Sequence, residues 1–114
     1  MKKTFIDNRF GTKQQVAVTF HRYSGSNNIA IRLVETESGL PWGIASVNIP
    51  GVTLSDDRVA IKNHTEGEGM DSLLIEAGII EPGPVDFHPS GYVNIPVYQL
   101  TKEAHAEAVS VARH

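Results

Sequence analysis

The chain has 114 residues, no cysteine and a formal net charge of −3. This length fits a single domain over residues 1–114, and the missing cysteines exclude disulfides, thiolate catalysis and cysteine-ligated metal sites. No apolar run reaches the length of a membrane helix. The start, Met1 to Phe10, lacks the apolar stretch of a signal peptide. We therefore expect a soluble, cytoplasmic protein.

The first half of the chain predicts an antiparallel meander of four strands. Residues 15–23 and 29–34 alternate between apolar and polar or small side chains, which is the period of a half-buried strand. Glycine and asparagine between them, at residues 24–28, favour a hairpin turn. A short strand at residues 4–7 and a further strand at residues 42–49 complete the meander.

A helix over about residues 66–77 is the strongest prediction. One face carries an apolar stripe at helical spacing, formed by Met70, Leu73, Leu74 and Ala77. Thr65 and Glu68 have the spacing of a capping box at its start. Gly78 is suited to the position after the last helical residue, where a left-handed backbone is common.

The remaining elements are two strands, a loop and a second helix. Residues 57–63 and 92–100 again alternate as strands do, whereas three prolines and a glycine at residues 81–90 predict a loop. Residues 102–114 are rich in alanine and charged residues but have a small apolar stripe. They predict a weaker C-terminal helix that docks loosely or frays.

These elements predict an α+β fold with a mainly antiparallel sheet of five to six strands. The helix at about 66–77 packs on one face. One helix does not cover six strands, so part of the sheet must face water, close on itself or meet a partner. The side chains expected to point inward are Val16, Val18, Phe20, Ile29, Ile31, Leu33, Val47, Ile49, Val59, Ile61, Leu73, Leu74, Val93 and Ile95.

The sequence shows no catalytic motif. There is no Gly-x-Ser-x-Gly nucleophile elbow and no close pair of histidine ligands. His64, Glu66 and Glu68 come nearest to a metal cluster, but the capping role of Glu68 competes with metal binding. We predict a protein that is not an enzyme, with no catalytic residues, no metal and no cofactor.

Charge is distributed unevenly along the chain. Residues 1–34 carry a net charge of +5, from six basic and one acidic side chain. Residues 55–86 carry −6, from eight acidic and two basic side chains. The two segments either neutralise each other by packing together or steer a charged partner.

The charge asymmetry suggests two alternative contact surfaces. A host protein or complex with a basic surface would meet the acidic segment, for which we single out Asp56, Asp57, Glu66, Glu68 and Asp71. Single-stranded nucleic acid would instead meet the basic meander by charge and by stacking on an aromatic ring. The residues of that alternative are Lys13, Arg22, Tyr23 and Arg32.

Several blocks of sequence, in a consistent order over about residues 9–100, carry a family resemblance. They are Arg9-Phe10-Gly11, the strand 29–33, the segment 45–52, Ile61-Lys62-Asn63 with Gly69-Met70, the segment 76–80 and the segment 89–93. The chain resembles a family of small, uncharacterised bacterial and phage proteins carried on plasmids, prophages and other mobile elements. The resemblance implies a non-catalytic, protein-binding accessory protein that inhibits a host defence system, of the anti-CRISPR or anti-restriction type.

Overall fold

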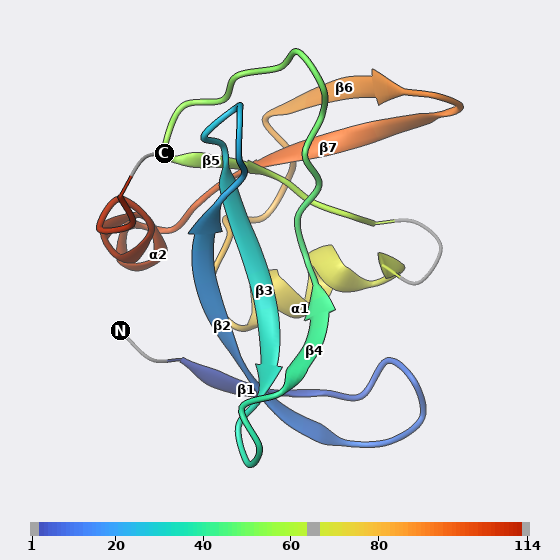
Figure 1. Ribbon diagram of the computed structural model, residues 1–114. Coiled ribbons are helices and arrows are strands. Elements are labelled where there is room, and N and C mark those ends of the chain that lie inside the picture. Colours follow the sequence, from blue (N-terminus) through green and yellow to red (C-terminus); the bar gives the residue numbers. More distant parts are fainter. Residues whose placement is uncertain (1–2, 64–66, 113–114) are drawn as a thin grey trace.

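The computed structural model describes residues 3–63 and 67–112 of the chain (Figure 1). It has an α+β fold with two antiparallel sheets and two helices. The first sheet contains, in sequence order, β1 (Thr4–Asp7), β2 (Gln14–Arg22), β3 (Ile29–Glu35) and β4 (Pro41–Ile44). The second contains β5 (Arg58–Ala60), β7 (Val93–Gln99) and β6 (Asp86–Ser90). The helices are α1 (Met70–Glu76) and α2 (Lys102–Ala108). The predicted class and the N-terminal meander are confirmed.

The strands form two sheets, where the sequence predicted one, because the chain changes partner just after β4. The Ala45 N–H donates to the Ile31 carbonyl of β3 at 2.9 Å. The Ala45 carbonyl instead accepts from the Lys62 N–H at 2.8 Å, beyond the end of β5. Ser46 and Ile61 form an isolated bridge at the same place. The predicted strand at residues 42–49 is therefore wrong beyond Ile44, and the switch at Ala45 folds one sheet onto the other.

The loop predicted at residues 81–90 is wrong over its second half, which forms β6. Phe87 pairs with Pro96, and Pro89 pairs with Asn94. β6 is an edge strand with a partner on one side, and an edge tolerates proline because one row of its N–H groups makes no ladder bond. The prolines thus limit where this strand lies in the sheet without preventing it.

Helix α1 begins later than predicted. Gly69 is its N-cap with a φ of 83°, and no side chain among the described residues caps the helix. The capping box is therefore wrong: Glu68 precedes the N-cap, and Thr65 lies outside the described residues. A left-handed φ at the N-cap favours glycine, which has no Cβ to clash.

The end of α1 is as predicted. Gly78 has a φ of 76°, and its N–H donates to the Ile75 carbonyl at 3.0 Å. The Ile79 N–H reaches back to the Leu74 carbonyl at 2.9 Å. These two bonds make a Schellman motif, which satisfies helix carbonyls that would otherwise lack partners.

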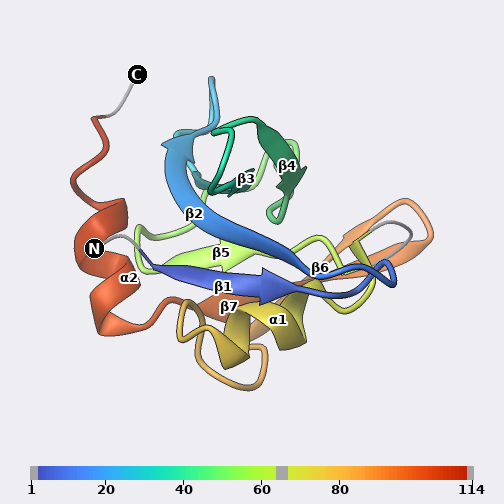
Figure 2. The same ribbon diagram turned by 90° about the horizontal axis from the view of Figure 1, so that it is seen from below.

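The main core lies between the two sheets and the helices. In the view from below, α1 lies on the opposite side of the molecule from β3 and β4 (Figure 2). The buried cluster includes Val16, Phe20, Ile31, Leu33, Val59, Ile61, Met70, Leu73, Leu74, Ile79, Ile80, Tyr98 and Leu100. A second, smaller cluster contains Ile49, Ala60, Ile95 and Val97. The core placement of α1 is therefore confirmed.

Most of the predicted inward side chains are buried, with one clear exception. Val18 and Val47 are half-buried and pack against the two clusters. Val93 is 37% exposed, so its inward placement is wrong. It lies beside the tip of the β6–β7 hairpin, beyond the side chains that cover Ile95 and Val97. The alternation of apolar residues along a strand does not show how far along the strand other side chains pack against them.

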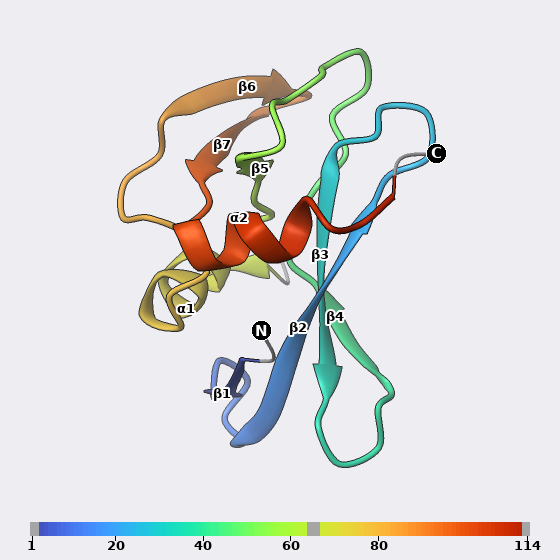
Figure 3. The ribbon, with the colours of Figure 1, turned by 90° about the vertical axis from the view of Figure 1, so that its left-hand side faces the viewer.

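The weaker C-terminal helix is α2, which runs past β2 (Figure 3). Its N-cap is Thr101, whose hydroxyl accepts from the Ala104 N–H at 3.2 Å. Ala104 and Ala108 are fully buried in the main core. Beyond the helix, the Val111 carbonyl accepts from Arg22 Nε at 2.8 Å. This bond ties the segment after α2 to the end of β2.

Candidate binding surface

Two of the charged residues singled out from the sequence, Arg22 and Asp56, form an ion pair with each other. Arg22 is 8% exposed and donates through its two terminal nitrogens to the Asp56 carboxylate at 2.9 and 3.1 Å. Arg22 also donates to the Asn27 carbonyl at 2.9 Å. The basic and acidic segments therefore meet here in a bidentate pair, whose planar geometry favours arginine. Both residues support the fold.

Two other predicted acidic residues are hydrogen-bonded within the protein. Asp57 accepts from Gln99 Nε2 at 2.8 Å, and this bond holds the pKa of the Asp57 carboxyl below its ordinary value. Asp71 accepts from the Tyr98 hydroxyl at 2.8 Å. Burial of the ring and this neighbouring carboxylate raise the pKa of Tyr98 to about 12. The carboxylates are therefore engaged by neutral donors that fix their orientation.

The last two predicted acidic residues are Glu68 and Glu66, of which the structure describes Glu68. Glu68 is exposed, just before α1. Glu66 lies outside the described residues. The described part of the set thus offers one exposed carboxylate, at Glu68, and three that are bonded internally.

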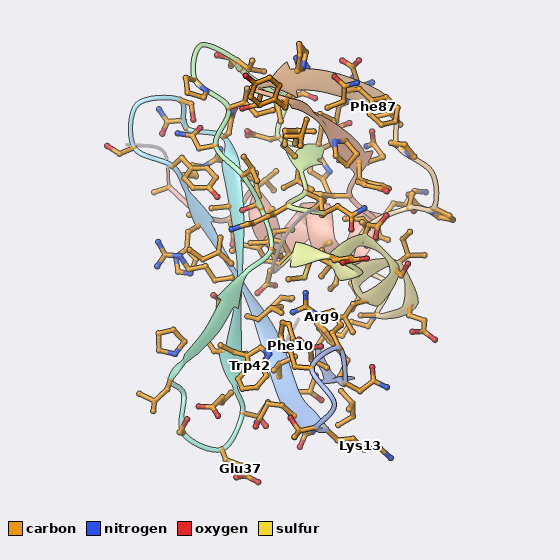
Figure 4. All side chains as sticks on the ribbon, turned by 90° about the vertical axis from the view of Figure 1, so that its right-hand side faces the viewer. Arg9, Phe10, Lys13, Glu37, Trp42 and Phe87 are labelled. Atoms are coloured by element: carbon orange, nitrogen blue, oxygen red, sulfur yellow. The ribbon has the colours of Figure 1, made fainter. Side chains whose placement is uncertain are left out.

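The structure also separates the residues of the nucleic-acid alternative. Tyr23 is half-buried and its hydroxyl bonds with Ser46 Oγ at 2.8 Å, so the ring is part of the fold. Lys13 is exposed in the loop between β1 and β2, at the bottom of Figure 4. Arg32 is exposed on β3, and it forms no ion pair with any described residue. Together with the buried Arg22, these residues do not form one patch.

Arg32 belongs to the outer face of the first sheet, where it influences His21. The His21 ring bonds through Nε2 with Thr19 Oγ1 at 2.8 Å. Burial lowers the pKa of His21 below 6.5, and the positive charge of Arg32 lowers it further. At neutral pH this face carries a fixed guanidinium beside an uncharged imidazole.

The replacement Arg32→Gln should raise the pKa of His21 while leaving it below 6.5. The substitution removes the repulsion between two positive charges, whereas burial of the ring remains. An NMR titration of the ring protons in both proteins measures the difference. An unchanged His21 titration in the variant would show that Arg32 does not act on this ring.

Three adjoining hollows run from this outer face to the β6–β7 hairpin. Their volumes are about 590, 370 and 470 Å³. The first and second share Ile44, and the second and third share Val93. We call this surface the β4–β7 groove. Its described lining includes Arg32, Trp42, Ile44, Lys62, Asn63, Phe87, Val93 and Tyr98.

Large apolar side chains are exposed along the β4–β7 groove. Ile44 is 53% exposed, Phe87 54% and Val93 37%. One polar atom in the groove, Asn63 Oδ1, is buried and has no hydrogen-bond partner in the described structure. Exposed apolar side chains and a buried polar atom without a partner are both typical of a site that is completed by a ligand or a protein.

A buried carboxylate holds a group of aromatic and basic side chains near one end of the groove. Asp7 is 1% exposed and accepts from Arg9 Nη2 at 2.7 Å and from Trp42 Nε1 at 2.9 Å. Phe10 lies beside Trp42, with ring centroids 6.5 Å apart, and the Arg9 guanidinium lies over the Phe10 ring (Figure 4). Phe10 is 57% exposed. Asp7 thus fixes an aromatic surface from within.

Sequence reasoning missed this group and most of the β4–β7 groove. One signal was present: Asp7 occupies the same strand face as Phe5, so a carboxylate falls where an apolar residue was expected. Phe87 fell in the segment read as a loop, and Val93 was assigned to the core. No sequence signal brings Ile44 close to either of them.

The described residues contain no group of three histidine, aspartate or glutamate side chains placed to hold a metal ion. His64 and Glu66 of the candidate metal cluster lie outside the described residues. In the part of the chain that the structure describes, no helix is long and apolar enough to cross a membrane.

We compared the chain with protein-family models, with curated proteins and with solved structures, and found no match in any of the three.

Proposed function

We propose that this protein acts by binding another protein, without catalysis, and that the β4–β7 groove is its contact surface. The observation that carries the proposal is the exposure of Ile44, Phe87 and Val93 along hollows that adjoin one another. Exposed apolar side chains that gather on one surface, with polar groups around them, often mark interaction sites.

The composition of the groove also favours a protein partner. Protein interfaces are enriched in aromatic residues and arginine relative to the rest of the protein surface. Phe87 and Tyr98 line one end of the groove, and Arg32 lines the other. The acidic segment fits the role less well because Asp56, Asp57 and Asp71 are already hydrogen-bonded within the protein.

The test is affinity capture from a host lysate with the parent protein and with the double variant Ile44→Asp, Val93→Asp. Both residues are exposed, so the fold should tolerate the charges. We expect binding of the captured partner to weaken by at least about tenfold, as for central interface residues. Val109→Asp is the matched control, since Val109 is 45% exposed and directly follows α2, a helix that lies on the other side of β2 and β3 from β4 (Figure 1).

The competing surface is tested in parallel by Glu68→Lys. The proposal fails if the charge reversal at Glu68 abolishes capture while the groove variant captures the partner normally. Such a result would mean that the partner binds the acidic segment and not the groove. Circular dichroism and thermal unfolding of each variant separate lost binding from lost folding.

A narrower role, inhibition of a host defence complex of the CRISPR or restriction type, follows from the sequence resemblance. It remains a proposal. Its test is the efficiency of phage plating on a strain with an active defence system, with and without this protein. Restored plating by the parent protein and by Val109→Asp, but not by the groove variant, would support it. Unchanged plating with all three would count against it.

A further inference from the structure

The open edge of β4 adjoins the outer-face hollow. β4 is the last strand of its sheet, and it lies in front of β3 when the molecule is seen from the side shown in Figure 4. Gly43 pairs with Leu33, and the Ala45 N–H bonds to Ile31. Backbone groups of an antiparallel strand point alternately toward and away from a given neighbour. The N–H and C=O of Ile44 therefore point away from β3, where no described strand pairs with them.

The sheet surface beside this edge is hollow. The adjoining hollow, about 590 Å³, is lined by Val34, Trp42 and Ile44 on its apolar side. A strand added to the edge would send every second side chain over this hollow, since side chains of a strand alternate between faces.

The charge of the outer face favours an added strand with acidic side chains. The described outward positions of β2 and β3 carry His21 and Arg32 near the hollow and no carboxylate. This face is therefore positive, although the whole chain carries −3. An acidic side chain over Arg32 would gain a charge-assisted hydrogen bond without meeting a like charge.

We infer that β4 accepts an extended segment of a partner protein as an added strand, with an acidic side chain over Arg32 and an apolar one beside Ile44. Main-chain bonds to Ile44 supply part of the affinity, and the hollow selects the side chains. This inference rests on the proposed function, because it specifies how a partner binds one end of the β4–β7 groove.

The test uses a synthetic peptide of about eight residues, a usual strand length, with alternating valine and glutamate. We expect it to bind and to shift the amide resonances of β4. A peptide with lysine in place of glutamate should bind at least about tenfold more weakly, because a charge-assisted hydrogen bond becomes a repulsion. The variant Arg32→Glu should reverse this preference. A glutamate peptide methylated at alternate backbone nitrogens should not bind, because it cannot form the ladder.

Two further measurements test whether the peptide binds at the open edge of β4. Ile44→Pro removes the open-edge N–H and should abolish peptide binding; if that variant does not fold, Arg32→Glu carries the test. A single-stranded oligonucleotide that binds through Arg32 when the peptides do not would overturn the inference in favour of nucleic acid. Equal binding of the glutamate and lysine peptides would also overturn it.

Failure of the inference and failure of the proposed function can be told apart. If Val93→Asp alone abolishes capture of the partner while no peptide shifts β4, the groove binds its partner without strand addition. If the glutamate peptide binds β4 but groove variants capture the partner normally, the edge is competent for binding and the proposed function is wrong.

Discussion

Replacing Asp7 by asparagine should lower the free energy of unfolding by about 3 kcal/mol, as for a buried ion pair that loses one charge. The Asp7 side chain is fully buried and lies 2.7 Å from Arg9 Nη2. Its two oxygens also accept from the Arg9 backbone N–H and from Trp42 Nε1. An asparagine removes the negative charge and turns an NH2 group toward donors. Urea unfolding, followed by the fluorescence of the single tryptophan, measures the loss.

The hydrogen bonds to Asp7 also predict how the stability difference between the parent and Asp7→Asn depends on pH. Burial raises the pKa of Asp7, but hydrogen bonds from Arg9 and Trp42 outweigh it, so the pKa lies below its ordinary value of 3.8. The stabilisation is therefore fully present above about pH 5 and is lost as the pH falls through the folded-state pKa. The difference between parent and Asp7→Asn should narrow below about pH 4.

Asp86→Asn provides the matched control for Asp7→Asn. The Asp86 side chain is 53% exposed and pairs with His88 at 3.3 Å. An exposed pair contributes little, so the free energy of unfolding should change by less than about 1 kcal/mol. Equal stability losses at Asp7 and Asp86 would contradict the role assigned to the buried carboxylate.

The second large effect is expected at Leu74, which is fully buried on α1. Leu74→Ala should cost on the order of 2 to 5 kcal/mol because it removes apolar contacts and leaves a cavity. In a domain of this size that loss lowers the thermal midpoint by roughly 10 °C or more. Thermal unfolding measured by circular dichroism gives the value directly.

Leu40→Ala is the control, since Leu40 is 59% exposed in the turn before β4. Its midpoint should stay close to that of the parent, because a surface substitution rarely changes the stability by more than about 0.5 kcal/mol. A Leu74→Ala midpoint equal to the parent's would mean that α1 does not cover the core and that this architecture is wrong.

Local patterns predicted the elements with strong periodicity, because their signals are contained in short stretches of chain. The stripe of Leu73 and Leu74 specifies the buried face of α1, and Gly78 specifies its end. The alternation of β2 and β3 gives their hairpin for the same reason. Where the chain changes partner, at Ala45, the signal is tertiary. No local pattern predicts that one residue bonds both to β3 and to the segment that follows β5.

The candidate site was predicted poorly for a related reason. Charge along the sequence does not reveal which charges satisfy one another, and Arg22 meets Asp56 only in the folded protein. Whether an apolar side chain on a strand is exposed likewise depends on whether side chains from other parts of the chain pack over it. Val93 has the same apolar character and strand phase as the buried Ile95, yet it lies exposed near the hairpin tip.

Amide hydrogen exchange of the protein, free and bound to its captured partner, shows whether the β4–β7 groove is the contact surface. We expect slower exchange on binding along β4 and the β6–β7 hairpin, at residues 41–44 and 86–99. The exchange of residues 67–71, beside the acidic segment's exposed Glu68, should stay unchanged. Protection confined to residues 67–71, with β4 and the hairpin exchanging as in the free protein, would contradict it.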